Sequence, residues 1–499
     1  MKRFYRQLAT DITIAVLIFL VSLSIHEGSF LQEIRNFGVP ALIYYGFHIF
    51  VSLANRKFET DERYSSTELF KPYLLSWLYS SCFALLILVT FQISDFSRLM
   101  ILTNMFGLLA GESLLVFFLN LFRKSVPLRE PEDISELNPK VLETLYPEIK
   151  EKRPGLKKKV ILPPSLKEGN VAFEFASKWF NLTADTCQIL ETTNHSNILG
   201  VHPGEYDQII NFQNINHIPR INHFFEAANS RLPMGGLLMV CAETTDQRKN
   251  RILKKYPPLL NRIYYLGDYL LMRVFPMFPV GKKIYFALTK GQSRVISTPE
   301  VLGRLISCGF EIAAEKKNTV RYYVVARKIR LPAIHNYATY GPLIHLNRIG
   351  KDGKIIKVYK LRTMFPYSEY VYNQNKLTNG GKIKNDFRIT AVGKFLRRYW
   401  LDELPGLYNW LCGEVKIVGV RPLSRHYFNL YTSELQQKRI QTKPGLIPPF
   451  YADLPQTLEE IMESEMRYLE CYEKAPLRTD VRYFLKAMYN IVLKGVKSQ

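Results

Sequence analysis

Four long apolar stretches occupy the first quarter of the chain, and charged residues border each of them. They cover residues 12–25, 39–54, 73–93 and 99–122. A helix needs about 20 mostly apolar residues to cross the hydrocarbon layer of a bilayer. The last two stretches reach this length by themselves, whereas the first two need flanking residues to complete the crossing. The pattern therefore predicts a transmembrane region of four helices over residues 1–124.

Basic residues are concentrated on one side of this region. Only Arg35 lies between the first and second stretches, and only Arg98 lies between the third and fourth. The other side carries Lys2, Arg3 and Arg6 before the first stretch, Arg56, Lys57, Arg63 and Lys71 after the second, and Arg123 and Lys124 after the fourth. Since basic loops stay in the cytoplasm, both termini are expected there. Glu112, an acid inside the fourth stretch, is expected to contact another helix.

Apolar runs alternate with helical patterns between residues 161 and 330. A linker at 125–160, rich in charge and proline and including the run KRPGLKKK, precedes them and is expected to be exposed. The pattern predicts buried strands at 206–215 and 235–244, an amphipathic helix at 218–232 between them, and two joined strands at 308–328. This alternation indicates an α/β domain with an antiparallel end.

The α/β segment resembles the later half of class I methyltransferases, where a helix, a Gly-Gly turn and a strand recur in that order. It departs from them because no GxGxG-like loop follows a strand between Gly169 and Tyr206, and the cofactor normally approaches such a loop closely. The resemblance implies a Rossmann-like domain with a structural or regulatory role. An apolar run at 266–291, which contains Arg273, is interpreted as a core helix of this domain in preference to an interfacial helix.

The composition adds a strong positive charge. The 499 residues include 67 Lys and Arg against 44 Asp and Glu, which gives a formal net charge of +23. Such a balance suits nucleic acid, an anionic membrane surface or phosphorylated substrates, and the apolar stretches favour the last two over nucleic acid. The six cysteines lie far apart without a CxxC pair, so we expect reduced thiols and neither a disulfide framework nor a zinc site.

An acid pair, Asp402 and Glu403, lies among arginines between residues 360 and 422. A guanidinium fits a phosphate in two-point contact, and a carboxylate can attack a phosphoryl group or hold its metal ion. The group therefore indicates phosphoryl-transfer chemistry. The alternative is structural, with the acids at the start of a helix, where its dipole favours them, beside solvated arginines. The arginines are Arg388, Arg397, Arg398 and Arg421.

Residues 340–451 carry an ordered series of motifs. In this series the sequence resembles the bacterial sugar transferases, the monotopic polyprenyl-phosphate phosphoglycosyl transferases that start exopolysaccharide and O-antigen synthesis. The resemblance implies a third domain at 331–499, α+β and mainly helical, and hence a multidomain membrane protein. The motifs are Gly-Pro at 341–342, RIGKDGK at 348–354, KLRTM at 360–364, DFRIT at 386–390, GKFLRR at 393–398, LDELP at 401–405 and a closing VRP at 420–422.

The family resemblance also implies a reaction. Such an enzyme moves a sugar 1-phosphate from a nucleotide diphosphate sugar to undecaprenyl phosphate and releases the nucleoside monophosphate. By position, Asp402 is implied as the nucleophile that takes up the phosphosugar covalently, Glu403 as a base, and both as ligands of Mg2+. The residues implied to hold phosphates and nucleotide are Arg362, Arg388, Arg397, Arg398, Arg421 and Lys443.

The resemblance further implies a location and partners. A multi-pass protein of the bacterial inner membrane is implied, with its catalytic domain in the cytoplasm and its substrate lipid in the bilayer. Downstream glycosyltransferases or a second copy of the chain are further candidate partners. Two other functions stay open, a non-catalytic assembly protein of a polysaccharide pathway and a methyltransferase acting through the α/β domain.

Three features depart from the family pattern. The closing motif is VGVRP, with Val420 in place of a proline, and Lys443 stands in place of an arginine, which keeps the charge but loses the fork. In the family, a helix that dips into the membrane directly precedes the Gly-Pro motif. Residues 333–339 before Gly341 are polar and short instead, so the four spans would have to position the site against the bilayer.

Overall fold

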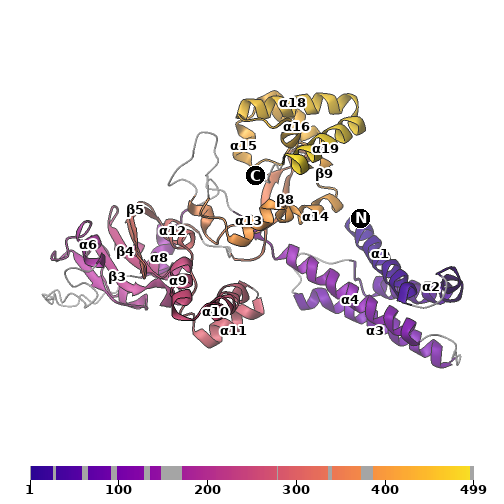
Figure 1. Cartoon of the computed structure of the whole chain (residues 1–499), viewed down its shortest axis with the longest axis horizontal. Helices are drawn as coiled ribbons and strands as arrows, with labels where there is room; N and C mark the ends of the chain where they lie inside the picture. The colour runs from indigo at the N-terminus through magenta and orange to yellow at the C-terminus, as the bar shows by residue number, and fades with distance from the viewer. Residues whose placement is uncertain are drawn as a thin grey trace. The chain divides into compact units, whose positions relative to one another are not determined.

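The computed structural model describes residues 2–25, 30–58, 66–90, 98–128, 135–147, 171–277, 279–334, 340–371 and 386–494. Contacts divide the chain into two units, Met1–Ser125 and Val126–Gln499. The first unit is helical, and the second holds an α/β region followed by a mainly helical C-terminal region (Figure 1).

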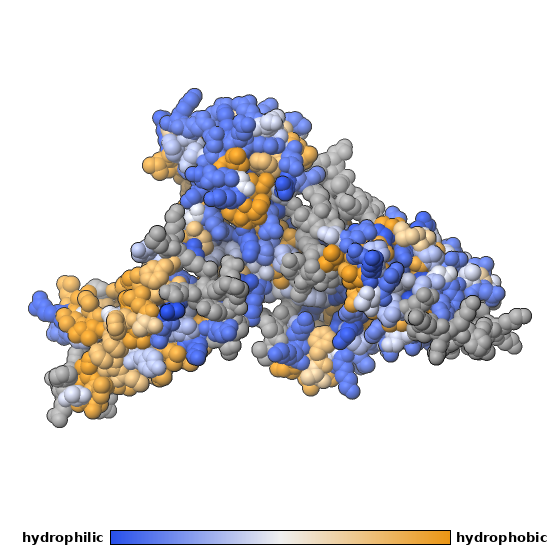
Figure 2. All heavy atoms as spheres, turned by 180° about the vertical axis from the view of Figure 1, so that it is seen from behind, coloured by the Kyte–Doolittle hydropathy of each residue, from blue (hydrophilic) through white to orange (hydrophobic). Residues whose placement is uncertain are grey.

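The first unit consists of four long helices, as the apolar stretches predict. Each is long and apolar enough to cross a membrane. Large apolar side chains such as Leu42, Leu86 and Val89 are exposed on them, and Figure 2 shows extensive apolar surface over this unit, which suits contact with lipid tails. The chain is therefore a membrane protein. The helices are α1 (Lys2–Ile25), α2 (Phe30–Ala54), α3 (Ser66–Thr90) and α4 (Arg98–Arg123).

Four titratable side chains meet inside this unit. Lys57 forms ion pairs with Asp11 and Glu112, and the Nε2 atom of His48 lies 2.7 Å from the Oε1 atom of Glu112. All four side chains are buried, and their opposite charges offset the cost of removing each from water. The contact predicted for Glu112 with another helix is confirmed.

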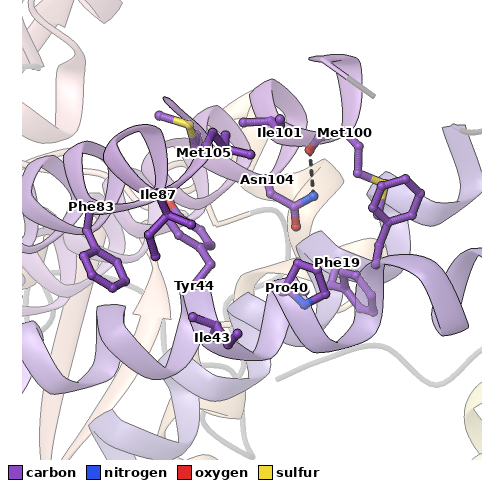
Figure 3. Close-up of a pocket in the computed structure, with 14 residues that line it drawn as sticks. Phe19, Pro40, Ile43, Tyr44, Phe83, Ile87, Met100, Ile101, Asn104 and Met105 are labelled. Atoms are coloured by element: carbon purple, nitrogen blue, oxygen red, sulfur yellow. Dashed lines mark hydrogen bonds between the residues drawn. The ribbon is translucent and has the colours of Figure 1, made fainter. Parts of the chain in front are cut away.

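An apolar cavity of about 220 Å³ lies among the same four helices. Figure 3 shows Phe19, Pro40, Tyr44 and Ile87 around it. Asn104 is the amide in its wall, and its Nδ2 atom donates to the carbonyl of Met100 at 2.8 Å. Because this amide already has a partner, the wall presents mainly hydrocarbon to the cavity.

The α/β region is built on a five-stranded sheet of order β2-β3-β4-β6-β5. The first three strands run parallel, and β6 is antiparallel to both β4 and β5. The strands and the helix predicted from the sequence are all present, and β5 and β6 form the predicted antiparallel end. The bounds are β2 (Cys187–Leu190), β3 (Gln208–Asn214), β4 (Leu237–Ala242), β5 (Phe310–Lys317), β6 (Tyr322–Lys328) and the helix α8 (Ile221–Arg231).

Helices cover both faces of this sheet. On one face, α8 and α12 (Thr298–Ser307) bury Phe224, Phe225 and Leu305 against the strands. On the other, α6 (Val171–Ser177) packs against strand residues such as Met239. Smaller elements of the region are η3 (Ile215–His217), α7 (Ser196–Leu199) and α9 (Thr245–Lys255).

The apolar run at 266–291 does not enter this core. It forms most of a helical hairpin of α10 (Leu260–Tyr269), the turns η4 (Leu270–Val274) and η5 (Phe275–Met277), and α11 (Pro279–Thr289). Leu271 and Leu288 are 61% and 79% exposed. The preferred interpretation as a core helix is therefore wrong. The run lies outside the core because α6, α8 and α12 already cover the two faces of the sheet.

Part of the segment predicted to be an exposed linker is built into the fold. The short strand β1 (Val126–Pro127) pairs with β7 (Leu343–Ile349), and α5 (Pro139–Leu145) buries Leu142 in the α/β core together with Tyr146. An apolar pair spaced four residues apart was the local signal for this helix. Residues 129–134 and 148–170, which include the basic run KRPGLKKK and Gly169, lie outside the described residues.

The C-terminal region begins with a three-stranded sheet of order β1-β7-β8. Val420, which stands in place of a proline in the closing motif, is buried with Tyr431, Leu435 and Tyr468. Its side chain therefore adds to the hydrophobic core of the C-terminal region. The remaining elements are β7 (Leu343–Ile349), η6 (Lys351–Gly353), β8 (Ile355–Leu361), η7 (Ser368–Val371), α13 (Ala391–Arg398), η8 (Leu401–Glu403), α14 (Gly406–Leu411), β9 (Lys416–Val418), α15 (Arg425–Asn429), α16 (Ser433–Gln441), β10 (Gly445–Ile447), α17 (Phe450–Asp453), α18 (Leu458–Lys474) and α19 (Pro476–Leu493).

A buried ionic network joins the α/β region to the C-terminal region. Glu300 of α12 accepts from Arg273 at 2.8 Å, from Arg304 at 2.9 Å and from the hydroxyl of Tyr340 at 2.6 Å. At Gly303 a Cβ atom would lie 2.0 Å from the carbonyl oxygen of Tyr367. Burial opposes the charge on Glu300, but the two arginines outweigh it and lower the pKa of Glu300 to about 2.

Replacing Glu300 by Gln is expected to destabilise this joint. Because the folded pKa lies below the unfolded one, the ionised group contributes about 3 kcal/mol of stability at neutral pH, and this contribution disappears as the pH falls toward 2. The midpoint of thermal unfolding at pH 7 should fall by several degrees relative to the exposed control Glu311→Gln. Equal midpoints for the two variants would contradict the role of this network.

Candidate active site

The strand β8 carries Lys360 to the acid pair. The Nζ atom of Lys360 lies 2.8 Å from the Oε1 atom of Glu403. The fully buried amide of Asn409, on α14, accepts from the backbone N–H of Tyr359 at 3.1 Å and donates to the carbonyl of Lys357 at 2.6 Å. These two bonds hold the helix after the acid pair against the strand that carries the lysine.

A close backbone contact positions Arg397. Thr390 caps the N-terminus of α13, and its backbone N–H donates to the carbonyl of Thr363 at 2.9 Å. At Gly393 a Cβ atom would lie 2.0 Å from that same carbonyl oxygen, so only glycine allows this approach. One turn later, Nε of Arg397 donates to the hydroxyl of Thr363 at 3.0 Å. The KLRTM and GKFLRR motifs are thereby packed onto each other.

The acid pair lies on a single helical turn, η8, directly after α13. Trp400 precedes it with a φ of 59°, in the left-handed region, and reverses the chain. Its ring packs on Tyr451 with 4.6 Å between centroids. Asp402 is buried, and its Oδ1 atom has no hydrogen-bond partner among the described residues. A buried carboxylate oxygen without a partner is costly, and a bound substrate or cation would supply the missing contact.

The charges around Asp402 act in opposite directions. Burial raises the pKa of the Asp402 carboxyl, and the neighbouring charge of Glu403 raises it further. Lys360 and Arg397 lower it in part. A carboxylate with a raised pKa is more basic than an exposed one and is poorly solvated, which are properties of a nucleophile or a general base.

Arg388 is engaged by a neighbouring acid. Its Nε and Nη2 atoms donate to both oxygens of Asp386 at 2.9 and 2.7 Å. Burial opposes the charge on Asp386, but these bonds lower the pKa of Asp386. Burial lowers the pKa of Arg397, the negative charge of Asp386 raises it in part, and the positive charge of Arg388 lowers it further. Arg388 therefore belongs to the same cluster, but its fork already holds a carboxylate.

The other sequence candidates make contacts with further parts of the domain. Nε of Arg362 donates to the carbonyl of Gly341 at 2.9 Å. The carbonyl of Arg421 accepts from Arg439 at 2.5 Å. Arg398 is exposed beside the ring of Tyr399, with 5.7 Å to its centroid, and the exposed Lys443 lies near Gly413.

Three residues of the cluster were not singled out from the sequence. Lys360, Thr363 and Asp386 all lie in the KLRTM and DFRIT motifs, beside residues that were. Because side chains alternate along a strand, the sequence of β8 predicts that Lys360 points to the opposite face from its two neighbours. Which residue each side chain contacts depends on how β8 packs against α13. The cluster thus includes the acids Asp386, Asp402 and Glu403, the arginines Arg388 and Arg397, and Lys360 and Thr363.

Apolar side chains are exposed on the helices that carry this charged cluster. The helices α13 and α14 and the turn between them expose several large apolar residues. An exposed group of this size beside a charged cluster suits a ligand or surface that has both a charged and an apolar part. They include Phe395, Tyr399, Leu404, Leu407, Trp410 and Leu411.

The comparisons with known proteins agree with these motifs. Residues 324–494 match the family of bacterial sugar transferases. The C-terminal part of this membrane protein is therefore a bacterial sugar transferase domain, and the resemblance seen in the sequence is confirmed. The match begins inside β6 of the α/β region.

Individual relatives are similar over the same domain. The chain is 38% identical over 112 residues to the galactosyl transferase CpsE of Streptococcus agalactiae, which is 21% of this chain and 25% of that protein. It is 42% identical over 109 residues to a UDP-glucose:undecaprenyl-phosphate glucose-1-phosphate transferase of Klebsiella pneumoniae, 21% of this chain and 22% of that protein.

A third relative is the undecaprenyl-phosphate galactose phosphotransferase of Salmonella typhimurium. It is 38% identical over 117 residues, 21% of this chain and 24% of that protein. The match thus spans about a quarter of the length of each of these three relatives.

Proposed function

We propose that this protein transfers a sugar 1-phosphate from a nucleotide diphosphate sugar to undecaprenyl phosphate and so starts the synthesis of a surface polysaccharide. The observation that carries the proposal is the acid pair of the buried Asp402 and the half-buried Glu403, beside Lys360 and Arg397, in a domain whose relatives are named for this reaction. Both substrates are polyanions, and one is a membrane lipid. The cationic cluster and the apolar surface of α13 and α14 suit these two properties.

The proposed reaction has two displacements at one phosphorus atom. A carboxylate oxygen of Asp402 attacks the sugar-bearing phosphorus, and the bond from that phosphorus to the bridging oxygen breaks, so the nucleoside monophosphate leaves with the electron pair. A phosphate oxygen of undecaprenyl phosphate then attacks the same phosphorus. The acyl-phosphate bond to Asp402 breaks, the carboxylate is restored, and the lipid carries the sugar diphosphate.

The other residues stabilise charge in this scheme. Arg397, fixed by Thr363, is proposed to contact the phosphates, where a guanidinium can make two contacts with one group. Lys360 balances the charge of Glu403 and keeps it beside Asp402. Arg388 is proposed to hold Asp386 in place, and the negative charge of Asp386 in turn acts on Arg397. Arg388 could bind a phosphate of the nucleotide only if that phosphate displaced Asp386 from its guanidinium.

Mg2+ fits the donors of this site. The partnerless Oδ1 atom of Asp402 and a carboxylate oxygen of Glu403 are hard ligands, and Mg2+ prefers such oxygens together with substrate phosphates. When bound, the ion would neutralise charge on the diphosphate. Asp402 and Glu403 would hold it, and Lys360 would remain as the counter-charge to Glu403.

The proposed location is the bacterial inner membrane. The alternation of basic residues along the first unit supports both termini in the cytoplasm. The transferase domain would then meet soluble nucleotide sugars on that side and the lipid acceptor in the bilayer.

The experiment that tests the proposal measures nucleotide release. Purified protein in detergent is mixed with undecaprenyl phosphate, Mg2+ and a panel of UDP-sugars, and free UMP is measured. Release that requires both the lipid and one of the sugars is the expected result. Tight binding of a UDP-sugar without any UMP release would favour a non-catalytic assembly protein instead.

The acid limb of the pH profile provides a separate prediction. Because the proposed nucleophile must be ionised, kcat/KM should fall below the raised pKa of Asp402, at a higher pH than an ordinary aspartate would give. Glu403→Gln removes a charge that raises this pKa, so the limb of the residual activity should move to lower pH. Glu403→Asp keeps the charge and should leave it in place. A limb that moves to higher pH in Glu403→Gln would contradict the coupling.

A further inference from the structure

The helical hairpin of residues 259–290, which comprises α10, η4, η5 and α11, has an uncovered apolar face. Leu259 and Ile263 are 76% and 62% exposed, and none of the residues of α10 is buried. No described element covers these side chains. Figure 1 shows α10 and α11 together at one end of the α/β region, beyond α9. The exposed apolar residues are Leu259, Leu260, Ile263, Leu266, Leu270, Leu271, Ile284 and Leu288.

The spacing of these residues places them on one stripe of each helix. Along α10 and into η4 they recur at intervals of three and four, at Ile263, Leu266 and Leu270. In α11, Ile284 and Leu288 are four residues apart. That periodicity makes a continuous apolar face on a helix. A soluble domain rarely exposes such a face without a partner.

The charges beside this face have one sign. From residue 251 to residue 290, Asp268 is the single acid in the sequence, and Arg248 pairs with it at 2.6 Å. Exposed basic residues flank both helices, and the ring of Tyr264 is exposed near them. An apolar stripe bordered by cations and tyrosine is typical of an element that lies in the interface of an anionic membrane. The exposed basic residues are Lys254, Lys255, Arg262, Lys282, Lys283 and Lys290.

Unlike Arg262, Arg273 turns away from this face. Arg273 is buried, and its Nη1 atom donates to Glu300 at 2.8 Å and to the carbonyl of Val295 at 2.8 Å. At Gly281 a Cβ atom would lie 2.1 Å from the carbonyl oxygen of Phe275, so α11 returns tightly against the turn. The ion pair with Glu300 therefore fixes the hairpin to α12. Because the charge of Arg273 is buried in this pair, it does not oppose contact of the apolar face with lipid.

We propose that the hairpin of residues 259–290 docks the α/β region onto an anionic bilayer, with its leucine and isoleucine stripe among the acyl chains and its lysines and arginines at the lipid phosphates. The bilayer is the occupant that the observations favour, because the four helices of the first unit already tether this chain to a membrane. The proposal does not depend on the transferase reaction, since it concerns only the contact of the hairpin with lipid.

Spin labels on the full chain test this contact. The exposed and half-exposed thiols Cys82, Cys412 and Cys471 are replaced by serine, and the buried cysteines are kept. Single cysteines are then introduced at Ile263, Leu271 or Leu288, and the labelled protein is reconstituted into vesicles containing phosphatidylglycerol. Power-saturation spectra report the collision of each label with oxygen, which is enriched in the bilayer, and with a water-soluble nickel chelate.

Two exposed apolar positions of the same region serve as matched controls. Met234 and Val320 are 64% and 65% exposed and lie outside the hairpin. The three hairpin labels are expected to collide more with oxygen than with the nickel chelate, and the two control labels more with the chelate. Hairpin labels that behave like the controls would overturn the proposal. Labels shielded from both reagents would also overturn it, because a protein partner or a second copy would then cover the face.

The lipid charge is tested in the same vesicles. Replacing phosphatidylglycerol by phosphatidylcholine should lower the ratio of oxygen to nickel collisions at Ile263 and Leu271, because the basic border then loses its counter-charges. An unchanged ratio would overturn the part of the proposal that assigns the lysines and arginines to anionic lipid.

Discussion

Asp402→Asn is expected to reduce UMP release by at least about 1,000-fold, because an amide cannot form the acyl-phosphate bond of the first displacement. The substitution is nearly isosteric, so the packing around η8 should survive. The folded state should even gain stability at neutral pH. Since burial raises the pKa of Asp402 in the folded protein, the ionised carboxylate costs free energy there, and a neutral amide avoids that cost.

The measurement combines activity with unfolding. UMP release and the unfolding midpoint are compared for Asp402→Asn and for the control Asp352→Asn, whose exposed residue has a φ of 58°, a conformation that asparagine accepts well. The control should retain full activity. Incubation with a sugar-labelled UDP-sugar, without lipid acceptor, should label the parent protein but not Asp402→Asn. Activity or labelling that survives in Asp402→Asn would refute the assigned nucleophile.

Gly393→Ala is expected to reduce turnover by about 100-fold although residue 393 touches no substrate in the proposed scheme. The added methyl group would lie 2.0 Å from the carbonyl oxygen of Thr363, so α13 must move away from the KLRTM segment. Such overpacking costs about 1–3 kcal/mol of stability. The same shift displaces Arg397 from Thr363, and a displacement of about 1 Å in a positioning group can cost about 100-fold in rate.

The neighbouring residue provides the control. Val392 is 58% exposed on the same helix. Because Val392→Ala keeps an apolar side chain at that position and makes no clash with Thr363, it should leave turnover and the unfolding midpoint nearly unchanged. Steady-state kinetics and thermal unfolding of both variants in detergent are the measurements. A Gly393→Ala protein with the activity and midpoint of Val392→Ala would mean that the contact between α13 and Thr363 does not position Arg397.

Local patterns were sufficient for most of the architecture. The four spans follow from the length of their apolar stretches, and the strands β3 and β4 follow from short buried runs bounded by turn residues. The hairpin at 266–291 could not be predicted in the same way, because an apolar run has the same composition whether protein or lipid covers it. Its position became clear only once the sheet faces were seen to be filled by other helices.

The candidate site was partly predictable for a related reason. The acid pair and Arg397 are marked by their motifs, and Arg388 lies two residues from Asp386, so its ion pair could have been expected from the sequence. The contact of Lys360 with Glu403 spans 43 residues and depends on how α14 and β8 pack through Asn409. The backbone contact of Arg421 with Arg439 likewise depends on the packing of α16, which no local pattern reveals.

The joint at Glu300 determines where the chain can be divided for recombinant work. A fragment that starts at residue 331 lacks α12, so the hydroxyl of Tyr340 loses its carboxylate partner and the backbone of Tyr367 loses its contact with Gly303. A cut between Ser125 and Val126 leaves both sides of this joint in one piece and keeps β1 on the sheet. Exchanging the transferase domain with that of a relative would therefore require a matching α12, so the two regions should be inherited and engineered together.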